Sequence, residues 1–338
     1  MREKILVIQT AFLGDAVLTL PMLEKISGKF PGSEIHVIAI PSTEEVFRIS
    51  PFCTKVIVMD KREKHKSIFA LYKFSKLIRS EKYTRIYSPH RSFRTSLLVL
   101  LSGVKETVGF DNASMSFVYK KKIRYNISFH EVQRDLELIG IDTEKDGWKV
   151  LPTVKIPADI EVHVEKLIDG LGENCLIAVA PGSVWATKVY PSEYYIEVIK
   201  NLTGKGNFVF LIGGKNEEQL CVEIEKKAGA NIKSFAGKLS VQESISLLRK
   251  CRLLISNDSA PTHLAMCAGI PVITLYCSTV PAFGFYPYNP FSKHLSYDDL
   301  KCKPCGIHGY DKCPIGTFEC GWKLLPQNVI DCVESLNI

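Results

Sequence analysis

A polar stretch from Ser256 to His263 follows an apolar strand pattern and precedes an apolar helical pattern. At such a helix start the backbone N–H groups of Ser259 and Ala260 have no partner within the helix and attract anions. Asp258 can accept hydrogen bonds from sugar hydroxyls, and His263 lies one turn into the helix. The stretch is therefore a candidate cradle for a sugar phosphate. Simple helix capping, with a histidine that only packs, is the alternative interpretation.

A second loop with phosphate-binding chemistry follows the strand pattern at 175–182. Gly182 permits close backbone approach, Ser183 and Thr187 supply hydroxyls, and Lys188 supplies a positive charge. The loop does not have the P-loop spacing, and an ordinary loop with a solvated lysine is the alternative. Together with the helix start at Ser259, Lys188 would hold a diphosphate without a metal. The sequence contains no Asp-x-Asp pair of the kind that binds a metal diphosphate.

Two further loops place carboxylates where a sugar nucleotide would need them. Glu217 and Glu218 follow a glycine pair after the strand pattern at 207–214, a place from which a carboxylate commonly accepts from ribose hydroxyls. Acidic residues also favour helix starts because of the helix dipole. Near the N-terminus, Asp15 follows Gly14 at the mouth of the first helical pattern, either as a cap or as a base that removes a proton from an attacking hydroxyl.

We expect the helix start to lower the pKa of Asp15, which would make it a weak, always ionised base. A weak base is sufficient if the diphosphate leaves early, in an oxocarbenium-like transition state, because the incoming hydroxyl then loses its proton late.

These loops all follow apolar strand patterns that alternate with helical ones. Strand patterns occur at 4–9, 34–40 and 55–60, and the alternation recurs after residue 157, with strands at 175–182, 207–214, 252–258 and 271–277. Such alternation is typical of parallel sheets covered by helices on both faces, in which ligands bind beyond the carboxyl ends of strands. With 338 residues and a polar linker at 142–159, the chain is expected to form two domains.

Charge separates the two halves. Residues 1–150 contain 25 basic and 17 acidic residues, whereas residues 151–338 contain 18 and 19, so the whole excess lies in the first half. A basic half favours an acidic partner, namely nucleic acid, anionic lipid or an acidic substrate, although a solvated lysine-rich surface is the simplest alternative. No nucleic-acid-binding motif accompanies the charge, which argues against nucleic acid. Neither a membrane-spanning apolar run nor a signal-peptide pattern is present, so a cytoplasmic protein is expected.

Several of these motifs together resemble the bacterial heptosyltransferases, glycosyltransferase family 9. They are GDAVLTLP near the N-terminus, HRSFRTSLLVLLSGVKETVGF in the first half, PGSVWATKVYP and NDSAPTHLAMCAGIPVITLY in the second, and CKPCGIHGYDKCPIGTFEC near the end. The similarity extends over nearly the whole chain. The forms that these motifs take in this sequence are most similar to those of the heptosyltransferase II branch of that family.

The resemblance implies a GT-B fold, in which two doubly wound Rossmann-like domains face a cleft and a C-terminal helix crosses back to the first domain. Residues 1–157 would bind the acceptor, 158–325 the nucleotide sugar, and 326–338 would form the crossing helix. It also implies an ADP-L-glycero-D-manno-heptose donor and inverting transfer that requires no cofactor or metal. By position Asp15 matches the family's base. The implied donor-binding residues are Ser183, Thr187, Lys188, Glu217 (ribose), Leu239 (adenine), Asp258, Ser259, Ala260 and His263.

The acceptor implied by the resemblance is an anionic lipopolysaccharide core that carries Kdo and heptose, which gives the basic first domain a partner. Candidate contacts are Arg91, Arg94, Lys120, Lys121, Lys122 and Arg124. A lipid acceptor places the enzyme at the cytoplasmic surface of the inner membrane, as a peripheral protein without a nucleic-acid partner.

Four of the eleven cysteines, Cys302, Cys305, Cys313 and Cys320, have metal-like spacing with His308 among them. Four thiolates suffice for a tetrahedral structural zinc, although the second pair lacks the usual CxxC spacing. Reduced structural thiols or a disulfide are the alternatives. Similar cysteines occur in the heptosyltransferases that the chain resembles, so the cluster supports the resemblance without establishing a metal.

Two other functions share parts of this pattern. A nucleotide-sugar epimerase would use the same fold and diphosphate site without a lipid acceptor, and a non-catalytic paralogue would only bind the nucleotide sugar. Asp15 distinguishes an enzyme from the non-catalytic paralogue, because a protein that only binds the nucleotide sugar has no use for a base at that position. A nicotinamide dehydrogenase is disfavoured because no GxGxxG follows either domain's first strand.

Overall fold

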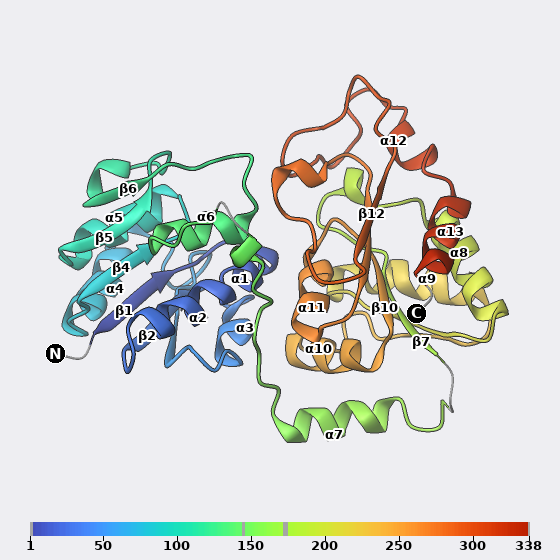
Figure 1. Ribbon diagram of the computed structural model, residues 1–338, viewed down its shortest axis with the longest axis horizontal. Helices are drawn as coiled ribbons and strands as arrows, with labels where there is room; N and C mark the ends of the chain where they lie inside the picture. Colours follow the sequence, from blue (N-terminus) through green and yellow to red (C-terminus); the bar gives the residue numbers. More distant parts are fainter. Residues whose placement is uncertain (1–2, 144–145, 172–174, 337–338) are drawn as a thin grey trace. The chain divides into compact units, whose positions relative to one another are not determined.

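The computed structural model describes residues 3–143, 146–171 and 175–336, and the chain divides into two compact units, Met1–Lys155 and Ile156–Ile338. Each unit contains a six-stranded parallel sheet with helices packed on its faces (Figure 1). The predicted pair of doubly wound α/β units is therefore confirmed. No helix within the described ranges is long and apolar enough to cross a bilayer.

The first unit has the strand order β3-β2-β1-β4-β5-β6. Its elements are β1 (Lys4–Ile8), α1 (Leu13–Leu18), α2 (Leu20–Lys29), β2 (Glu34–Ala39), α3 (Glu44–Arg48), β3 (Lys55–Val58), α4 (Ile68–Ser80), β4 (Arg85–Ser88), α5 (Phe93–Ser102), β5 (Glu106–Phe110), β6 (Lys121–Ile123) and α6 (Glu131–Leu138). The sequence order reverses between β1 and β4, and such a reversal opens a crevice at the carboxyl ends of the two strands.

The second unit repeats this order as β12-β11-β10-β7-β8-β9. Its elements are α7 (Ala158–Leu167), β7 (Leu176–Ala180), α8 (Ser192–Gly204), β8 (Phe208–Leu211), α9 (Glu218–Ala228), β9 (Ile232–Ser234), α10 (Val241–Lys250), β10 (Leu253–Asn257), α11 (Ala260–Ala268), β11 (Val272–Tyr276), β12 (Lys293–Ser296), α12 (Glu319–Trp322) and α13 (Pro326–Ser335). Here the reversal falls between β7 and β10, which precede the two phosphate-binding candidate loops.

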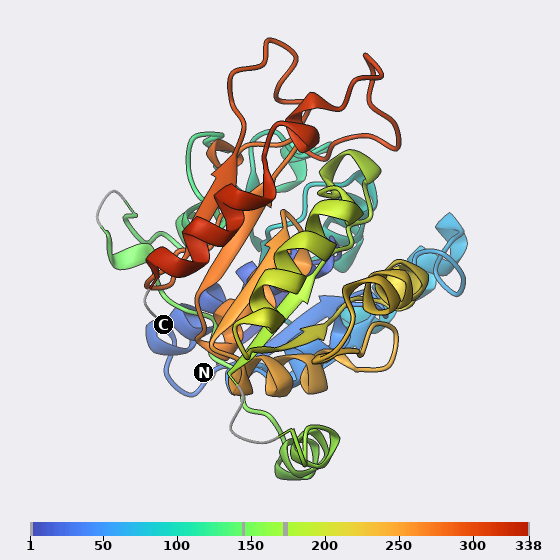
Figure 2. The same ribbon diagram turned by 90° about the vertical axis from the view of Figure 1, so that its right-hand side faces the viewer.

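The final helix, α13, packs within the second unit. Val329 and Ile330 are buried in that unit's core, and α13 lies beside α8 (Figure 2). The expectation that this helix also crosses back to the first domain concerns a contact between the two units and stays a prediction. Its apolar face covers β11, β12 and α8, which would otherwise expose apolar side chains of the same core.

A long irregular segment, residues 297–318, connects β12 to α12. Two backbone hydrogen bonds fix it to the loops at the carboxyl ends of the central strands: Cys305 N donates to Ser278 O over 2.8 Å, and Thr187 N donates to Tyr310 O over 3.0 Å. The 297–318 segment therefore borders the candidate site described next.

Candidate functional site

A buried ion pair joins the two loops at the reversal in the second unit. Lys188 Nζ lies 2.6 Å from Asp258 Oδ2 and donates to the Asp258 carbonyl over 3.2 Å. Thr279 Oγ1 also donates to Asp258 Oδ2, over 2.7 Å. The side chains of Lys188 and Asp258 are only 13% and 11% exposed, so the pair is fixed in place with little screening by water. Thr279 belongs to the site although the sequence did not single it out.

The start of α11 has no side-chain cap. Its N-cap residue is Ser259, whose side chain accepts no backbone N–H of the helix, while the neighbouring Asp258 carboxylate is held by Lys188 and Thr279. The polar stretch before α11 therefore does not serve as an ordinary cap. An uncapped helix start beside a lysine is suited to an anion.

Asn257, the last residue of β10, holds the Lys188 loop against the strand ends. Its Oδ1 accepts from Tyr190 N and from the Tyr195 hydroxyl, each over 3.0 Å. Its Nδ2 donates to the carbonyls of Pro181 (2.8 Å) and Gly182 (3.2 Å). All four side-chain hydrogen-bonding positions are thus used, and Asn257 positions the phosphate-binding loop, a role the sequence analysis missed.

His263 is buried on α11, and its Nδ1 has no hydrogen-bond partner in the described part of the chain. Burial lowers its pKa to about 4, an effect that the Asp258 carboxylate opposes and that Lys188 reinforces. The imidazole is therefore neutral at pH 7 and available for a hydrogen bond rather than as a cation.

The other hydroxyl-bearing residues of the Lys188 loop support the loop itself. Thr187 is 4% exposed and its Oγ1 accepts from Tyr310 N over 2.8 Å, while Ser183 Oγ accepts from Trp185 N over 3.5 Å. The Trp185 ring stacks on His308 with 6.2 Å between ring centroids. The 297–318 segment is thus attached to the candidate site by both backbone and ring contacts.

Glu217 packs over the glycines of the two neighbouring loops. A Cβ on Gly182 would lie 2.1 Å from Glu217 Cγ, and one on Gly214 would lie 2.9 Å from Glu217 Oε2. Only glycine at 182 leaves room for this carboxylate at the carboxyl ends of β7 and β8. Leu239 lies between β9 and α10 and is half-exposed. Ala260 begins α11 and is also half-exposed.

In the first unit Asp15 lies in the first turn of α1. The pKa of its carboxyl is raised to about 7, first by burial and second by the Glu131 carboxylate; backbone N–H groups and Arg91 act in the opposite direction. The expectation of a lowered pKa is therefore wrong. α1 has only six residues, and its dipole does not offset desolvation next to a like charge.

Beneath Asp15, α6 contributes a buried acidic cluster. Glu131 forms an ion pair with Arg134 over 2.6 Å, and Arg134 also donates to Tyr125, Asn126 and Ile127. Asp135 is fully buried; its Oδ2 lies 2.8 Å from Thr19 Oγ1, and its Oδ1 has no partner among the residues described.

The hydrogen bonds of the Thr19 hydroxyl bear on the protonation state of Asp135. It lies 2.8 Å from Asp135 Oδ2 and 2.9 Å from the Asp15 carbonyl, and it accepts from Gln9 Nε2. One hydroxyl hydrogen cannot serve two acceptors. A protonated Asp135 that donates to Thr19 removes this conflict, and burial together with the Glu131 carboxylate raises the pKa of Asp135 well above its usual value. The raised pKa favours the protonated form of Asp135.

His90 joins the loops after β1 and β4, at the reversal of the first sheet. Its Nδ1 lies 2.8 Å from Thr10 Oγ1 and 2.9 Å from Thr95 Oγ1. Burial lowers the pKa of His90 to about 4, so the ring is neutral at pH 7. It fixes the carboxyl edge of the sheet near Asp15 without adding charge.

The six basic candidates of the first unit have different surroundings. The Arg91 guanidinium lies 3.8 Å from the centroid of the Tyr125 ring and acts on the Asp15 carboxyl, so it is near the base. Arg94 donates to the carbonyls of His65 (2.6 Å) and Lys66 (2.8 Å) and thus supports a loop. Lys120 pairs with Glu106. Lys121, Lys122 and Arg124 are exposed at the edge strand β6 and after it.

The four cysteines of the predicted zinc site lie on the 297–318 segment and at the start of α12. Within the described ranges, no group of three or more His, Cys, Asp or Glu side chains is arranged to hold a metal ion. Cys320 is 7% exposed and packs in the core, which raises its thiol pKa to about 11, whereas Cys302 is exposed. All four are free thiols, and Cys302, Cys305 and Cys313 act electrostatically on Cys320, so the zinc site stays a prediction.

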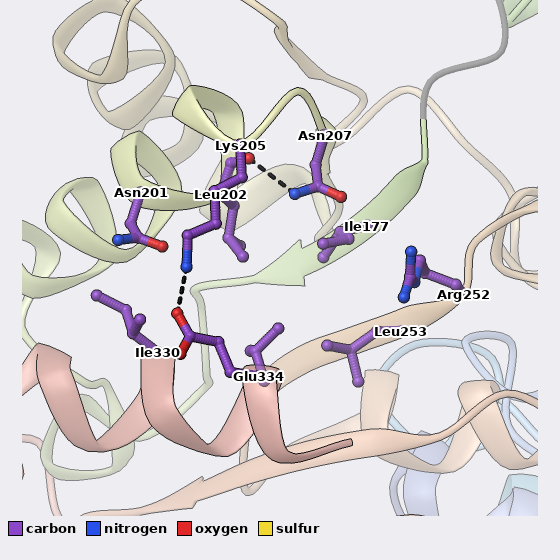
Figure 3. Close-up of a pocket in the computed structure, with 10 residues that line it drawn as sticks. Ile177, Asn201, Leu202, Lys205, Asn207, Arg252, Leu253, Ile330 and Glu334 are labelled. Carbon is purple, nitrogen blue, oxygen red and sulfur yellow. Dashed lines mark hydrogen bonds and ion pairs between the residues drawn. The ribbon is translucent and has the colours of Figure 1, made fainter. Parts of the chain in front are cut away.

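A cavity of about 170 Å³ lies between α8 and α13 at the amino ends of β7 and β10 (Figure 3). The Lys205–Glu334 ion pair crosses it, and Asn207 Nδ2 donates to the Leu202 carbonyl at its edge. Lys188 and Asp258 follow the opposite, carboxyl ends of the same two strands. The cavity is therefore separate from the candidate site.

The sequence matches the family model of "Glycosyltransferase family 9 (heptosyltransferase)" over residues 71–309. It is 23% identical over 338 residues to lipooligosaccharide heptosyltransferase 2 of Campylobacter jejuni, covering 99% of each chain. The matched residues include the Lys188 loop, the start of α11 and much of the 297–318 segment.

Two solved structures have the same fold. The family 9 glycosyl transferase of Veillonella parvula has a TM-score of 0.86 and 22% identity, over 99% of this chain and 97% of that one. The heptosyltransferase WaaC of E. coli, solved with ADP-2-deoxy-2-fluoro heptose, has a TM-score of 0.72 and 17% identity, over 98% and 99%.

Proposed function

Because the chain belongs to glycosyltransferase family 9, we propose that it transfers heptose from ADP-L-glycero-D-manno-heptose to the inner-core heptose and Kdo region of lipopolysaccharide. The reaction inverts the anomeric carbon and needs no metal. The observation that carries the donor assignment is the buried Lys188–Asp258 pair beside the uncapped start of α11. The relative from Campylobacter jejuni and the ligand of the E. coli structure support a heptose donor.

The donor's diphosphate binds between Lys188 and the N-terminus of α11. Both groups stabilise negative charge that grows on the leaving ADP, so they act most strongly in the transition state. Neutral His263 supplies a hydrogen bond near the same helix start, Glu217 binds the ribose, and Leu239 contacts the adenine.

Asp15 removes the proton from the acceptor hydroxyl. The hydroxyl oxygen forms the new bond to the anomeric carbon as the bond to the diphosphate breaks, and the electron pair leaves with ADP. A carboxylate with a pKa near 7 is a stronger base than an ordinary aspartate and is about half ionised at pH 7. This value favours catalysis over mere binding of a nucleotide sugar, because a binder has no need of such a base.

The acceptor is an anionic lipid, held by Arg91 and the exposed basic residues Lys121, Lys122 and Arg124. Arg94 and Lys120 do not contact the acceptor directly in this proposal, because each has a partner within the unit. The enzyme works as a peripheral protein on the cytoplasmic face of the inner membrane.

Calorimetric titration with ADP and then ADP-heptose, in EDTA, tests the donor site. We expect both to bind, the sugar nucleotide more tightly. Lys188→Ala should weaken ADP binding by roughly 1.5–3 kcal/mol, the range for a lost hydrogen bond to a charged group. Lys200→Ala, on an exposed face of α8, is the matched control and should leave affinity unchanged.

Two outcomes would overturn the donor assignment. Equal ADP affinity in Lys188→Ala and the wild type would remove this lysine from the site. Failure of the folded wild type to bind either nucleotide would leave the family's fold without its proposed donor.

A further inference from the structure

Helix α4 exposes large apolar side chains at its N-terminal half. Ile68 is 70% exposed, Phe69 66% and Tyr72 44%. Phe69, Tyr72 and Lys76 are spaced i, i+3 and i+7, which places them on one face of the helix. Single exposed apolar residues are ordinary, but three within five residues at the start of one helix form a continuous apolar surface.

The opposite face fixes the helix to the first unit. Leu71, Phe74 and Ile78 are buried in that unit's core. The segment before the helix is also held, because Arg94 of α5 donates to the carbonyls of His65 and Lys66. The exposed face of α4 is therefore presented in a fixed orientation.

Positive charge surrounds this apolar surface. Residues 61–80 contain seven basic residues and a single acidic one, Glu63, a net charge of +6 in a chain whose total is +7. Lys73 Nζ lies 4.7 Å from the centroid of the Phe69 ring, and Lys76 Nζ lies 4.8 Å from that of Tyr72. Cations thus lie directly beside the exposed rings.

This combination distinguishes between acidic partners. A nucleic acid would complement the lysines but offers no apolar phase for Ile68 and Phe69. A second copy of the chain would bring the same positive charge against itself. An anionic membrane complements both features: its headgroups attract lysines, while aromatic and aliphatic side chains enter the boundary between headgroups and acyl chains.

We propose that the exposed face of α4 is a docking site for an anionic lipid membrane. Phe69 and Ile68 insert at the headgroup boundary, Tyr72 lies at headgroup level, and Lys73 and Lys76 pair with lipid phosphates. The surface belongs to the first unit, and Arg94, one of the basic acceptor candidates, holds the segment that precedes it. The inference rests on the proposed function only in that a lipid-borne acceptor explains why the enzyme needs a membrane.

Vesicle co-sedimentation tests the surface without any donor or acceptor. The full chain is mixed with vesicles of equal parts phosphatidylglycerol and phosphatidylcholine, or of phosphatidylcholine alone. We expect binding to the anionic vesicles only, weakened by salt. Lys73→Gln/Lys76→Gln should lower the partition coefficient roughly 30-fold, because each lysine near the surface contributes about fivefold. Phe69→Ser/Tyr72→Ser should also lower it severalfold.

Matched controls are available in the second unit. Phe291 is 68% exposed, so Phe291→Ser removes an equally exposed ring, and Lys226→Gln/Lys227→Gln removes two exposed lysines from α9. Both variants should bind vesicles as the wild type does. Unchanged circular dichroism and thermal unfolding would exclude misfolding of the α4 variants.

The proposal would be overturned if the wild-type protein stayed in the supernatant with anionic vesicles, or if the α4 variants sedimented as well as the wild type. It would also be overturned if the wild type were a dimer that did not bind vesicles and the α4 substitutions converted it to monomers. Because the assay contains no sugar nucleotide, a positive result with no heptosyl transfer would reject the proposed function alone. Transfer to a soluble acceptor fragment that is unchanged by the α4 variants, with no vesicle binding, would reject the docking surface alone.

Discussion

At Asp15, two electrostatic effects of opposite sign compete. The start of a helix favours a carboxylate, typically by 0.3–1 kcal/mol at exposed positions. Burial next to Glu131 disfavours it more strongly, and the resulting pKa is about 7. The residue type and its position in the loop could be predicted from the sequence. Its pKa could not, because Glu131 approaches from 116 positions further along the chain.

The pKa of Asp15 predicts the pH dependence of transfer. The base must be ionised, so kcat/KM should fall by about tenfold per pH unit below about 7 and level off above it. Glu131→Gln removes a like charge and should move the inflection to lower pH, while Glu63→Gln, at an exposed position, should not. Initial rates from pH 5 to 8 are the measurement. A flat profile, or an inflection that Glu131→Gln leaves in place, would contradict the role of Asp15 as the base.

Asp135 is predicted to lower stability as pH rises. A group whose pKa is raised on folding stabilises the folded state fully below the unfolded pKa, 3.8, and loses that contribution as pH rises toward the folded pKa. Asp135→Asn keeps a donor for Thr19 and has no proton to lose. In urea unfolding at pH 4 to 8, the wild type should therefore lose stability relative to this variant. Parallel curves would show that Asp135 is ionised when folded.

At the scale of elements, local patterns predicted the strands and helices that carry the site. The buried strand β7 is a continuous apolar run followed by the Lys188 loop, and β10 begins with an apolar run and ends in the first two residues of the polar stretch before α11. The packing partner of α13 could not be read in this way. An amphipathic helix specifies that one face is buried but not which surface covers it. The role of Asn257 was missed for a similar reason, because its four partners come from another loop and helix.

The packing of α13 predicts that the second unit depends on it. Ile330 is 5% exposed within that unit's core, so Ile330→Ala should lower the free energy of unfolding by about 2–5 kcal/mol. Gln327→Ala, on the exposed side of the same helix, should have a small effect. Urea unfolding followed by the fluorescence of Trp185 and Trp322, both in the second unit, measures the change. Equal effects of the two substitutions would mean that α13 is not a core element.

At the scale of the whole molecule, the proposed reaction needs both units, because the proposed base belongs to the first and the proposed leaving-group site to the second. The distribution of charge agrees with this proposal, because the excess of basic residues lies in the half of the chain that is proposed to bind the anionic lipid acceptor. Family and fold could be predicted because several short motifs typical of the family, most of them near strand ends, are spread along nearly the whole chain. The donor's sugar is implied by the resemblance alone and stays a prediction.

Metal independence is the property that tests the whole arrangement. Lys188 and the start of α11 already provide positive potential at the proposed diphosphate site, so transfer should be unchanged in excess EDTA and not stimulated by Mg²⁺. In Lys188→Ala that potential is reduced, and added Mg²⁺, which can itself bind a diphosphate, should restore part of the lost rate. Lys200→Ala should respond like the wild type. Loss of wild-type activity in EDTA that Mg²⁺ reverses would show instead that a cation shares the diphosphate with Lys188, and the helix start alone would not account for departure of ADP.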